Sequence, residues 1–222
     1  MRLPAKKKYL QIAFNRTWSE VREMVNYLPA SDRILVEAGT PFIKKYGQEG
    51  ISALDQWWSV RLGRPGYVVA DLKCMDRGST EVEEAAAAGA SAVTCLGLAP
   101  IDTINEFIKK CQNSQVDSMI NMLNVDFPFE VLQKLKSMPD IVVLHRGADE
   151  GVINREKMLR LDQIRRIKGA YNIFISVAGG ETSREVISSA FNDADIVVVW
   201  RTFYEQPKQT TQLAEDFLRN VK

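Results

Sequence analysis

Three charged side chains stand at the end of an apolar run in the first half of the chain. Asp71, Lys73 and Asp76 follow Tyr67–Ala70, a run that is typical of a buried strand. Side chains alternate along a strand, so Asp71 and Lys73 are expected on one face and Asp76 beyond the strand end. A lysine with two carboxylates at that position is a catalytic arrangement if the strand belongs to a parallel sheet or barrel. The alternative is a surface loop with an ordinary ion pair.

A third acid extends this cluster. Glu37 ends another apolar run, and together with Asp71, Asp76 and Lys73 it gives a formal charge of −2. If these groups share one barrel mouth, that charge needs compensation, and a divalent cation bound through oxygen ligands would supply it. Two carboxylates with waters and substrate oxygens suit Mg²⁺, so Glu37 and Asp71 are the candidate metal ligands. Glu37 as a simple ion-paired acid is the alternative.

Other polar groups follow further apolar runs. His145 is the only histidine, and its ordinary pKa of about 6.5 suits proton transfer near neutral pH. Gly179 and Gly180 precede an expected helix, and Arg201 follows the last apolar run. Barrel phosphate sites commonly use the loops after the seventh and eighth strands, so these three residues predict a phosphorylated ligand. Asn15, after the first run, is a further candidate substrate contact.

The elements that must position these residues alternate regularly along the chain. The expected strands are Tyr9–Phe14, Ile34–Glu37, Tyr67–Lys73, Ala92–Leu96, Ser118–Leu123, Ile141–His145, Ile173–Val177 and Ile196–Val199. The expected helices are Trp18–Tyr27, Gly50–Leu62, Ser79–Ala88, Ile101–Cys111, Pro128–Ser137, Met158–Ile167, Thr182–Phe191 and Gln209–Val221. Repeated strand–helix units with short connections predict parallel pairing and an α/β fold, a (β/α)8 TIM barrel.

The barrel is expected to form one domain over residues 1–222. A doubly wound open sheet is the alternative fold. That fold would normally place a glycine-rich turn after the first strand, where this chain has Asn15–Trp18.

Composition and charge limit the kinds of binding partner and the cellular location that we expect. The net charge is +1, which gives no general electrostatic case for nucleic acid or membrane binding. Three cysteines without a CxxC motif favour structural thiols in a reducing compartment. Lys6, Lys7 and Lys8 precede no apolar core of signal-peptide length, and no run is long enough to span a bilayer, so a cytoplasmic location is expected.

Several longer motifs carry a resemblance. Glu37-Ala38-Gly39-Thr40-Pro41, the run from Ala70 to Gly78 and Val177 to Gly180 stand in the positions described above, together with His145. With these motifs the chain resembles the orotidine 5′-phosphate decarboxylase suprafamily of (β/α)8 barrels. Within it, the chain is most similar to the 3-hexulose-6-phosphate synthases.

The resemblance implies an aldehyde-lyase that condenses formaldehyde with ribulose 5-phosphate reversibly through an enediolate. It implies that Mg²⁺ is held by Glu37 and Asp71, that Lys73 stabilises the developing oxyanion and that His145 moves the proton. Asp76 would orient Lys73 or the sugar hydroxyls. In this suprafamily that aspartate commonly reaches across a dimer interface, so a homodimer is implied.

Alternatives remain open at this point. The 3-keto-L-gulonate 6-phosphate decarboxylases share the acid, the histidine and the Mg²⁺, and orotidine 5′-phosphate decarboxylases carry a lysine where this chain has Glu37. Asn15 and Trp200 depart from the family pattern, which typically has an aspartate and a glycine there. A paralogue with an altered substrate or lost activity is therefore a further hypothesis. Trp200 is expected to pack behind its strand, on the face opposite Arg201.

Overall fold

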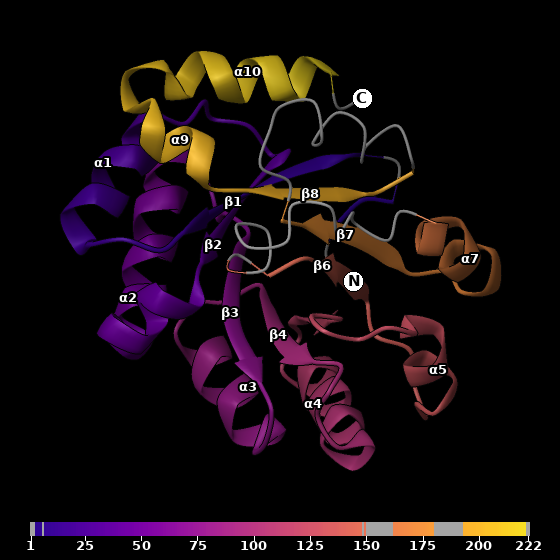
Figure 1. The fold of residues 1–222 in the computed structure, drawn as a ribbon. Helices are drawn as coiled ribbons and strands as arrows, with labels where there is room; N and C mark the ends of the chain where they lie inside the picture. The colour runs from indigo at the N-terminus through magenta and orange to yellow at the C-terminus, as the bar shows by residue number, and fades with distance from the viewer. Residues whose placement is uncertain (1–2, 6, 148, 150–161, 180–192, 221–222) are drawn as a thin grey trace.

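The strands of this chain close into a barrel. The computed structural model describes residues 3–5, 7–147, 149, 162–179 and 193–220, and Figure 1 shows helices surrounding the strands of this described part. Within it, eight strands pair in parallel in chain order, and β8 pairs with β1 to complete the ring. The expected (β/α)8 barrel is confirmed, and the open doubly wound sheet is excluded.

All eight expected strands are present, and their ends differ from the expected ones by at most two residues. They are β1 Tyr9–Phe14, β2 Ile34–Ala38, β3 Val68–Cys74, β4 Ala92–Leu96, β5 Asp117–Asn121, β6 Ile141–His145, β7 Phe174–Ala178 and β8 Ile196–Val199. Because the strands run parallel, all their carboxyl ends open at one mouth of the barrel.

The helices of the described residues fill the connections. They are α1 Trp18–Tyr27, α2 Thr40–Leu62, α3 Gly78–Ala87, α4 Ile101–Asn113, α5 Pro128–Gln133, α7 Asp162–Ala170, α9 Arg201–Glu205, the 3₁₀ turn η1 Pro207–Gln209 and α10 Thr210–Asn220. The expected helix Thr182–Phe191 lies outside the described residues, as does the expected start of the sixth helix at Met158.

Helix α2 begins ten residues before the expected start at Gly50. Pro41 occupies the first turn, where its missing N–H costs no hydrogen bond, and the helix therefore starts directly after Gly39. Gly47 then interrupts the helix with φ 56° and ψ −145°, a conformation that glycine adopts without strain. The short helical segment before Gly47 carries Thr40 to the mouth of the barrel.

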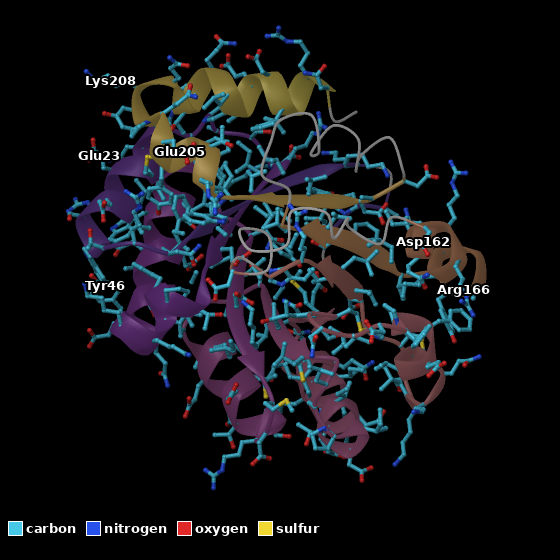
Figure 2. All side chains as sticks on the ribbon, in the orientation of Figure 1. Glu23, Tyr46, Asp162, Arg166, Glu205 and Lys208 are labelled. Atoms are coloured by element: carbon cyan, nitrogen blue, oxygen red, sulfur yellow. The ribbon has the colours of Figure 1, made fainter. Side chains whose placement is uncertain are left out.

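Alternation along the strands separates two apolar layers. On β1, Leu10, Ile12 and Phe14 pack outward against the helices, whereas Tyr9 and Ala13 belong to the cluster inside the barrel. Charged side chains lie on the outer surface of the helical ring, as Figure 2 shows for Glu23 and Arg166. The inward positions near the carboxyl ends are therefore the ones available to a functional site.

The three cysteines are free thiols in the outward-facing core. Cys74 on β3, Cys95 on β4 and Cys111 on α4 are all buried. Burial raises the pKa of the Cys111 thiol, which keeps it protonated and unreactive. The prediction of structural thiols is confirmed.

Across the described residues, no helix combines the length and the apolar character needed to cross a membrane.

Candidate active site

A cavity of about 470 Å³ opens at the carboxyl ends of the strands, and all eight strands contribute to its lining. Its polar lining residues are Gln11, Asn15, Glu37, Thr40, Asp71, Lys73, Thr94, Asn121, His145 and Arg146. The apolar lining includes Met119 on β5, Val143 on β6, Val198 on β8 and Trp200 directly after β8. The ionisable groups of β2 and β3 therefore share the cavity with apolar side chains and with the polar residues of β5 and β6.

The centre of the polar side is a network around Asp71. The Lys73 ammonium donates to Asp71 Oδ2, and it also donates to Thr40 Oγ1 at 2.9 Å. Thr94 Oγ1 donates to Asp71 Oδ1 at 2.9 Å, and the Thr40 hydroxyl lies 2.9 Å from Asp71 Oδ2. Asp71 is 6% exposed, so the hydrogen bonds of this network stabilise a carboxylate that is almost fully buried. The expectation that Asp71 and Lys73 share one face is confirmed.

The backbone of Lys73 adopts an uncommon conformation. Its φ is 50°, in the left-handed region, and the pairing of β3 with β4 shifts register between Ala70 and Cys74. The Lys73 N–H donates to Thr94 Oγ1 at 2.9 Å, so a side chain satisfies a donor that the shifted ladder has released. A non-glycine residue in this region costs about 1–2 kcal/mol. Such strain clusters at functional sites, where surrounding contacts maintain it.

Glu37 lies beside this network at the end of β2 and is 8% exposed. Gln11 Nε2 donates to Glu37 Oε2 in a short hydrogen bond. Burial, with the charge of Asp71 second, raises the pKa of Glu37 to about 8, although Lys73 and the hydrogen bond from Gln11 act in the opposite direction. An ionised Glu37 therefore needs more positive charge than Lys73 alone provides.

Asp76 lies away from the cavity. It is exposed after the end of β3, and its Oδ1 accepts a hydrogen bond of 2.8 Å from the backbone N–H of Arg77. This position corrects the expected charge cluster, because only Glu37, Asp71 and Lys73 meet on this side, with a formal charge of −1. The strand ends at Cys74, so the turn carries Asp76 outward.

His145 and Asn121 form a second polar pair. The Asn121 amide Nδ2 lies 3.0 Å from His145 Nδ1, and the Leu123 N–H donates to Asn121 Oδ1 at 3.1 Å. Asn121 Oδ1 also lies 3.1 Å from His145 Nδ1, so either atom of the amide can hydrogen-bond this nitrogen, according to the tautomer that the imidazole adopts. His145 thus enters the cavity lining with one nitrogen fixed by its neighbour.

Asn15 depends on Gly39 for its position. A Cβ on Gly39 would lie 2.0 Å from Asn15 Oδ1 and 2.9 Å from the carbonyl oxygen of Phe14. Only glycine leaves room for this amide, which lines the cavity at the end of β1.

Gly179 also lines the cavity, and its φ of 98° favours glycine. A Cβ there would lie 2.4 Å from the carbonyl oxygen of Arg146, whose guanidinium donates to the Gly179 carbonyl oxygen at 3.0 Å. Gly180, the second glycine of the expected phosphate site, lies outside the described residues. The phosphate role of the pair therefore stays a prediction.

The expectation for Trp200 is wrong. Ile196 and Val198 point into the barrel, and Trp200 continues this alternation and lines the cavity, although it also packs against the outer apolar cluster. Arg201 begins α9 outside this lining, with its guanidinium carbon 5.3 Å from the centre of the Trp200 ring. Binding of phosphate by Arg201 stays a prediction.

Gln11 and Thr40 are among the cavity residues that were not sequence candidates. Gln11 is a lone polar residue inside the apolar run of β1, and that contrast is the signal that could have identified it. Thr40 lies in a stretch where no helix was expected, although it belongs to the Glu37–Pro41 motif. Both hydrogen-bond the acids that the sequence did identify.

The fold and the cavity define a (β/α)8-barrel protein with ionisable groups at the carboxyl ends of β2, β3 and β6. The model of the orotidine 5′-phosphate decarboxylase / HUMPS family matches residues 8–215, and the chain belongs to this family. The resemblance drawn from the motifs is thereby confirmed.

Relatives and solved structures agree with this assignment. The chain is 39% identical to the "Bifunctional enzyme Fae/Hps" of Methanothrix thermoacetophila over 217 residues, which are 96% of this chain and 53% of that protein. It is 35% identical to the Methanosarcina barkeri protein of the same name over 215 residues, 96% of this chain and 52% of the relative. The chain thus spans about half the length of the curated relatives it matches.

Among solved structures, the 3-hexulose-6-phosphate synthase from Salmonella typhimurium superposes with a TM-score of 0.82 at 25% identity, covering 96% of this chain and 100% of that one. The structure of KGPDC from Streptococcus mutans superposes with a TM-score of 0.78 at 19% identity, covering 97% of this chain and 99% of that one, and shows the fold alone.

Proposed function

We propose that the chain is an aldehyde-lyase of the 3-hexulose-6-phosphate synthase type, which joins formaldehyde to ribulose 5-phosphate reversibly. The observation that carries the proposal is the meeting of Glu37 with the Asp71–Lys73 network in one cavity. The names of the Fae/Hps relatives and of the Salmonella structure support it. Since the chain spans about half of those relatives, the proposal concerns the synthase reaction only.

The residues of the cavity fit a hard divalent cation. Glu37 and Asp71 are buried carboxylates, and their combined negative charge exceeds the single positive charge of Lys73 beside them. The described residues form no group of three or more histidine, cysteine or acidic side chains that could hold a metal ion. A donor set of two carboxylates completed by water and ligand oxygens suits Mg²⁺. We therefore propose Glu37 and Asp71 as its ligands.

When bound, the cation would stabilise negative charge on the ketose oxygens by charge neutralisation. The chain's own groups perform the remaining steps. In the proposed reaction, His145 removes a proton from C1 of ribulose 5-phosphate, and the Lys73 ammonium donates a hydrogen bond to the developing oxyanion. The enediolate carbon then attacks the carbon of formaldehyde, and the formaldehyde oxygen takes up the proton that His145 removed, which gives the new hydroxyl and restores neutral His145. The reverse sequence releases formaldehyde.

The phosphate of the sugar is proposed to lie toward the loops after β7 and β8, where Gly179, Gly180 and Arg201 supply backbone N–H groups and positive charge. Trp200 then forms an apolar wall beside this end of the substrate.

We also propose a homodimer in which Asp76 completes the site of the partner subunit. A cytoplasmic location is proposed as well, because a reducing compartment suits three free thiols.

The proposal is tested by measuring formaldehyde release from hexulose 6-phosphate. Activity should vanish after EDTA treatment and return with Mg²⁺, and Glu37→Gln should abolish it without loss of fold, because the amide removes a charged ligand. Glu81→Gln is the matched control, since Glu81 is a partly buried acid outside the cavity. Full activity of EDTA-treated protein would reject the metal-dependent mechanism. Release of CO₂ from 3-keto-L-gulonate 6-phosphate instead would assign the decarboxylase reaction.

A further inference from the structure

Gln11 is a polar residue deep in the barrel that the proposed reaction leaves without a role. It lies in the middle of β1, is 2% exposed, and has Leu35 of β2 and Val198 of β8 as its register partners. Its side chain lines the cavity. A primary amide at such a depth costs free energy unless both of its ends find hydrogen-bond partners.

The two ends of this amide are in different situations. Nε2 donates to Glu37 Oε2, whereas Oε1 is buried and has no hydrogen-bond partner among the described residues. The reverse orientation would place Oε1 against the Glu37 carboxylate, acceptor against acceptor. Glu37 is ionised when it binds the cation, so the loaded site keeps the observed orientation, and Gln11 Oε1 stays in the cavity without a donor among the described residues.

A hydrogen bond to one carboxylate oxygen has a geometric consequence. It limits the rotation of the Glu37 side chain and uses one lone pair of Oε2, so that Oε1 of Glu37 is the oxygen with both lone pairs available to a ligand. Groups that hold a metal ligand in this way affect metal affinity although they do not touch the metal.

We propose that Gln11 is a positioning residue of this site: its Nε2 holds Glu37 so that one carboxylate oxygen faces the divalent cation, and its Oε1 accepts a hydrogen bond from a hydroxyl of the bound sugar. The inference rests on the proposed function, from which it takes both the cation and the sugar phosphate. It assigns the two ends of one amide to two ligands and therefore predicts two separate effects.

The first effect is on cation binding, which can be measured without turnover. Mn²⁺ is titrated into metal-free protein and followed by electron paramagnetic resonance, with Mn²⁺ as the paramagnetic substitute for Mg²⁺. Gln11→Met keeps the length of the side chain and removes both polar ends, and it should weaken Mn²⁺ binding by about 10- to 100-fold. Gln11→Asn, which retains the amide but is too short to hold Glu37 in the same way, should act in the same direction.

Ser176→Ala is the matched control. Ser176 is a fully buried inward residue of β7 whose Oγ has no partner among the described residues, and it does not line the cavity. Its removal should leave Mn²⁺ affinity unchanged, and circular dichroism should verify the fold of every variant.

The second effect is on the sugar. At saturating Mn²⁺, Gln11→Met should weaken the binding of ribulose 5-phosphate by about 2- to 10-fold, the effect of one lost hydrogen bond. Equal affinity for the sugar in the variant and the wild type would overturn the role of Oε1.

The role of Nε2 and the proposed function fail in distinguishable ways. If Glu37→Gln loses Mn²⁺ while both Gln11 variants bind within twofold of wild type, the inference is overturned and the cation site stands. If wild-type protein binds no Mn²⁺, or Glu37→Gln binds as tightly as wild type, the cation site is rejected and the inference is rejected with it.

Discussion

At the scale of single residues, Lys73 is held as a hydrogen-bond donor, which argues against a covalent mechanism. Its ammonium donates to Asp71 and Thr40, and a protonated amine has no lone pair for attack on a carbonyl. We expect that borohydride added with ribulose 5-phosphate leaves the mass of the Lys73 peptide unchanged. A borohydride-stable sugar adduct on that peptide in the wild type, absent from Lys73→Met, would contradict a purely electrostatic role.

The site residues differ in how far the sequence could predict their places. Period-two alternation predicts that Asp71 and Lys73 share a face, and both line the cavity although the ladder shifts register beside Lys73. Gln11 and Glu37 lie on different strands, 26 residues apart. Their hydrogen bond depends on the stagger between β1 and β2, which neither strand's own sequence contains.

At the scale of elements, the sequence predicts the strands better than their ends. All eight strands are confirmed because buried parallel strands read as continuous apolar runs between turn residues. The end of β8 shows what an apolar run does not reveal. All four residues of β8 are apolar, so the sequence does not show whether Ile196 and Val198 or the other two residues face the barrel axis. In the structure Ile196 and Val198 face inward, and the same alternation carries Trp200 inward.

The loop between β2 and α2 is the tightest point of the site. Gly39→Ala would place a methyl group 2.0 Å from Asn15 Oδ1, so Asn15 and the end of β1 must move. We expect a loss of about 1–3 kcal/mol in the free energy of unfolding, together with a higher KM for the sugar phosphate. Urea unfolding and steady-state kinetics measure the two effects.

Gly169→Ala is the control for this prediction. Gly169 lies in α7, and a Cβ there would meet no atom within 4 Å. Its replacement should leave KM unchanged and stabilise the helix by up to about 1 kcal/mol. An unchanged KM and an unchanged unfolding free energy in Gly39→Ala would show that the Asn15 contact is not needed.

At the scale of the whole molecule, barrel closure brings residues from Gln11 to Trp200 into one cavity. The carboxyl-end rule for parallel barrels predicts this gathering from the order of elements alone. Asp76 shows the limit of this rule, because it follows the end of β3 and yet does not line the cavity of its own chain. The part that we propose for it depends on assembly, which a single sequence does not fix.

The proposed homodimer makes a testable statement about Asp76. If Asp76 completes the site of the partner subunit, Lys73→Met and Asp76→Asn should each be inactive as homodimers. Co-expression of the two variants should restore activity, because a mixed dimer contains one site without any substitution. With random pairing about one quarter of all sites are intact. Co-expressed pairs that stay inactive, although mixed dimers are isolated with two affinity tags, would contradict a shared site.

We propose above all that this cavity makes a carbon–carbon bond between formaldehyde and a ketose phosphate. The most direct measurement is NMR of the protein with ¹³C-labelled formaldehyde, ribulose 5-phosphate and Mg²⁺. We predict that the label moves from hydrated formaldehyde into a new hydroxymethyl carbon of a hexulose 6-phosphate, and that neither Glu37→Gln nor EDTA-treated protein produces this signal. Label that stays in formaldehyde with the Mg²⁺-loaded wild-type protein would contradict the account.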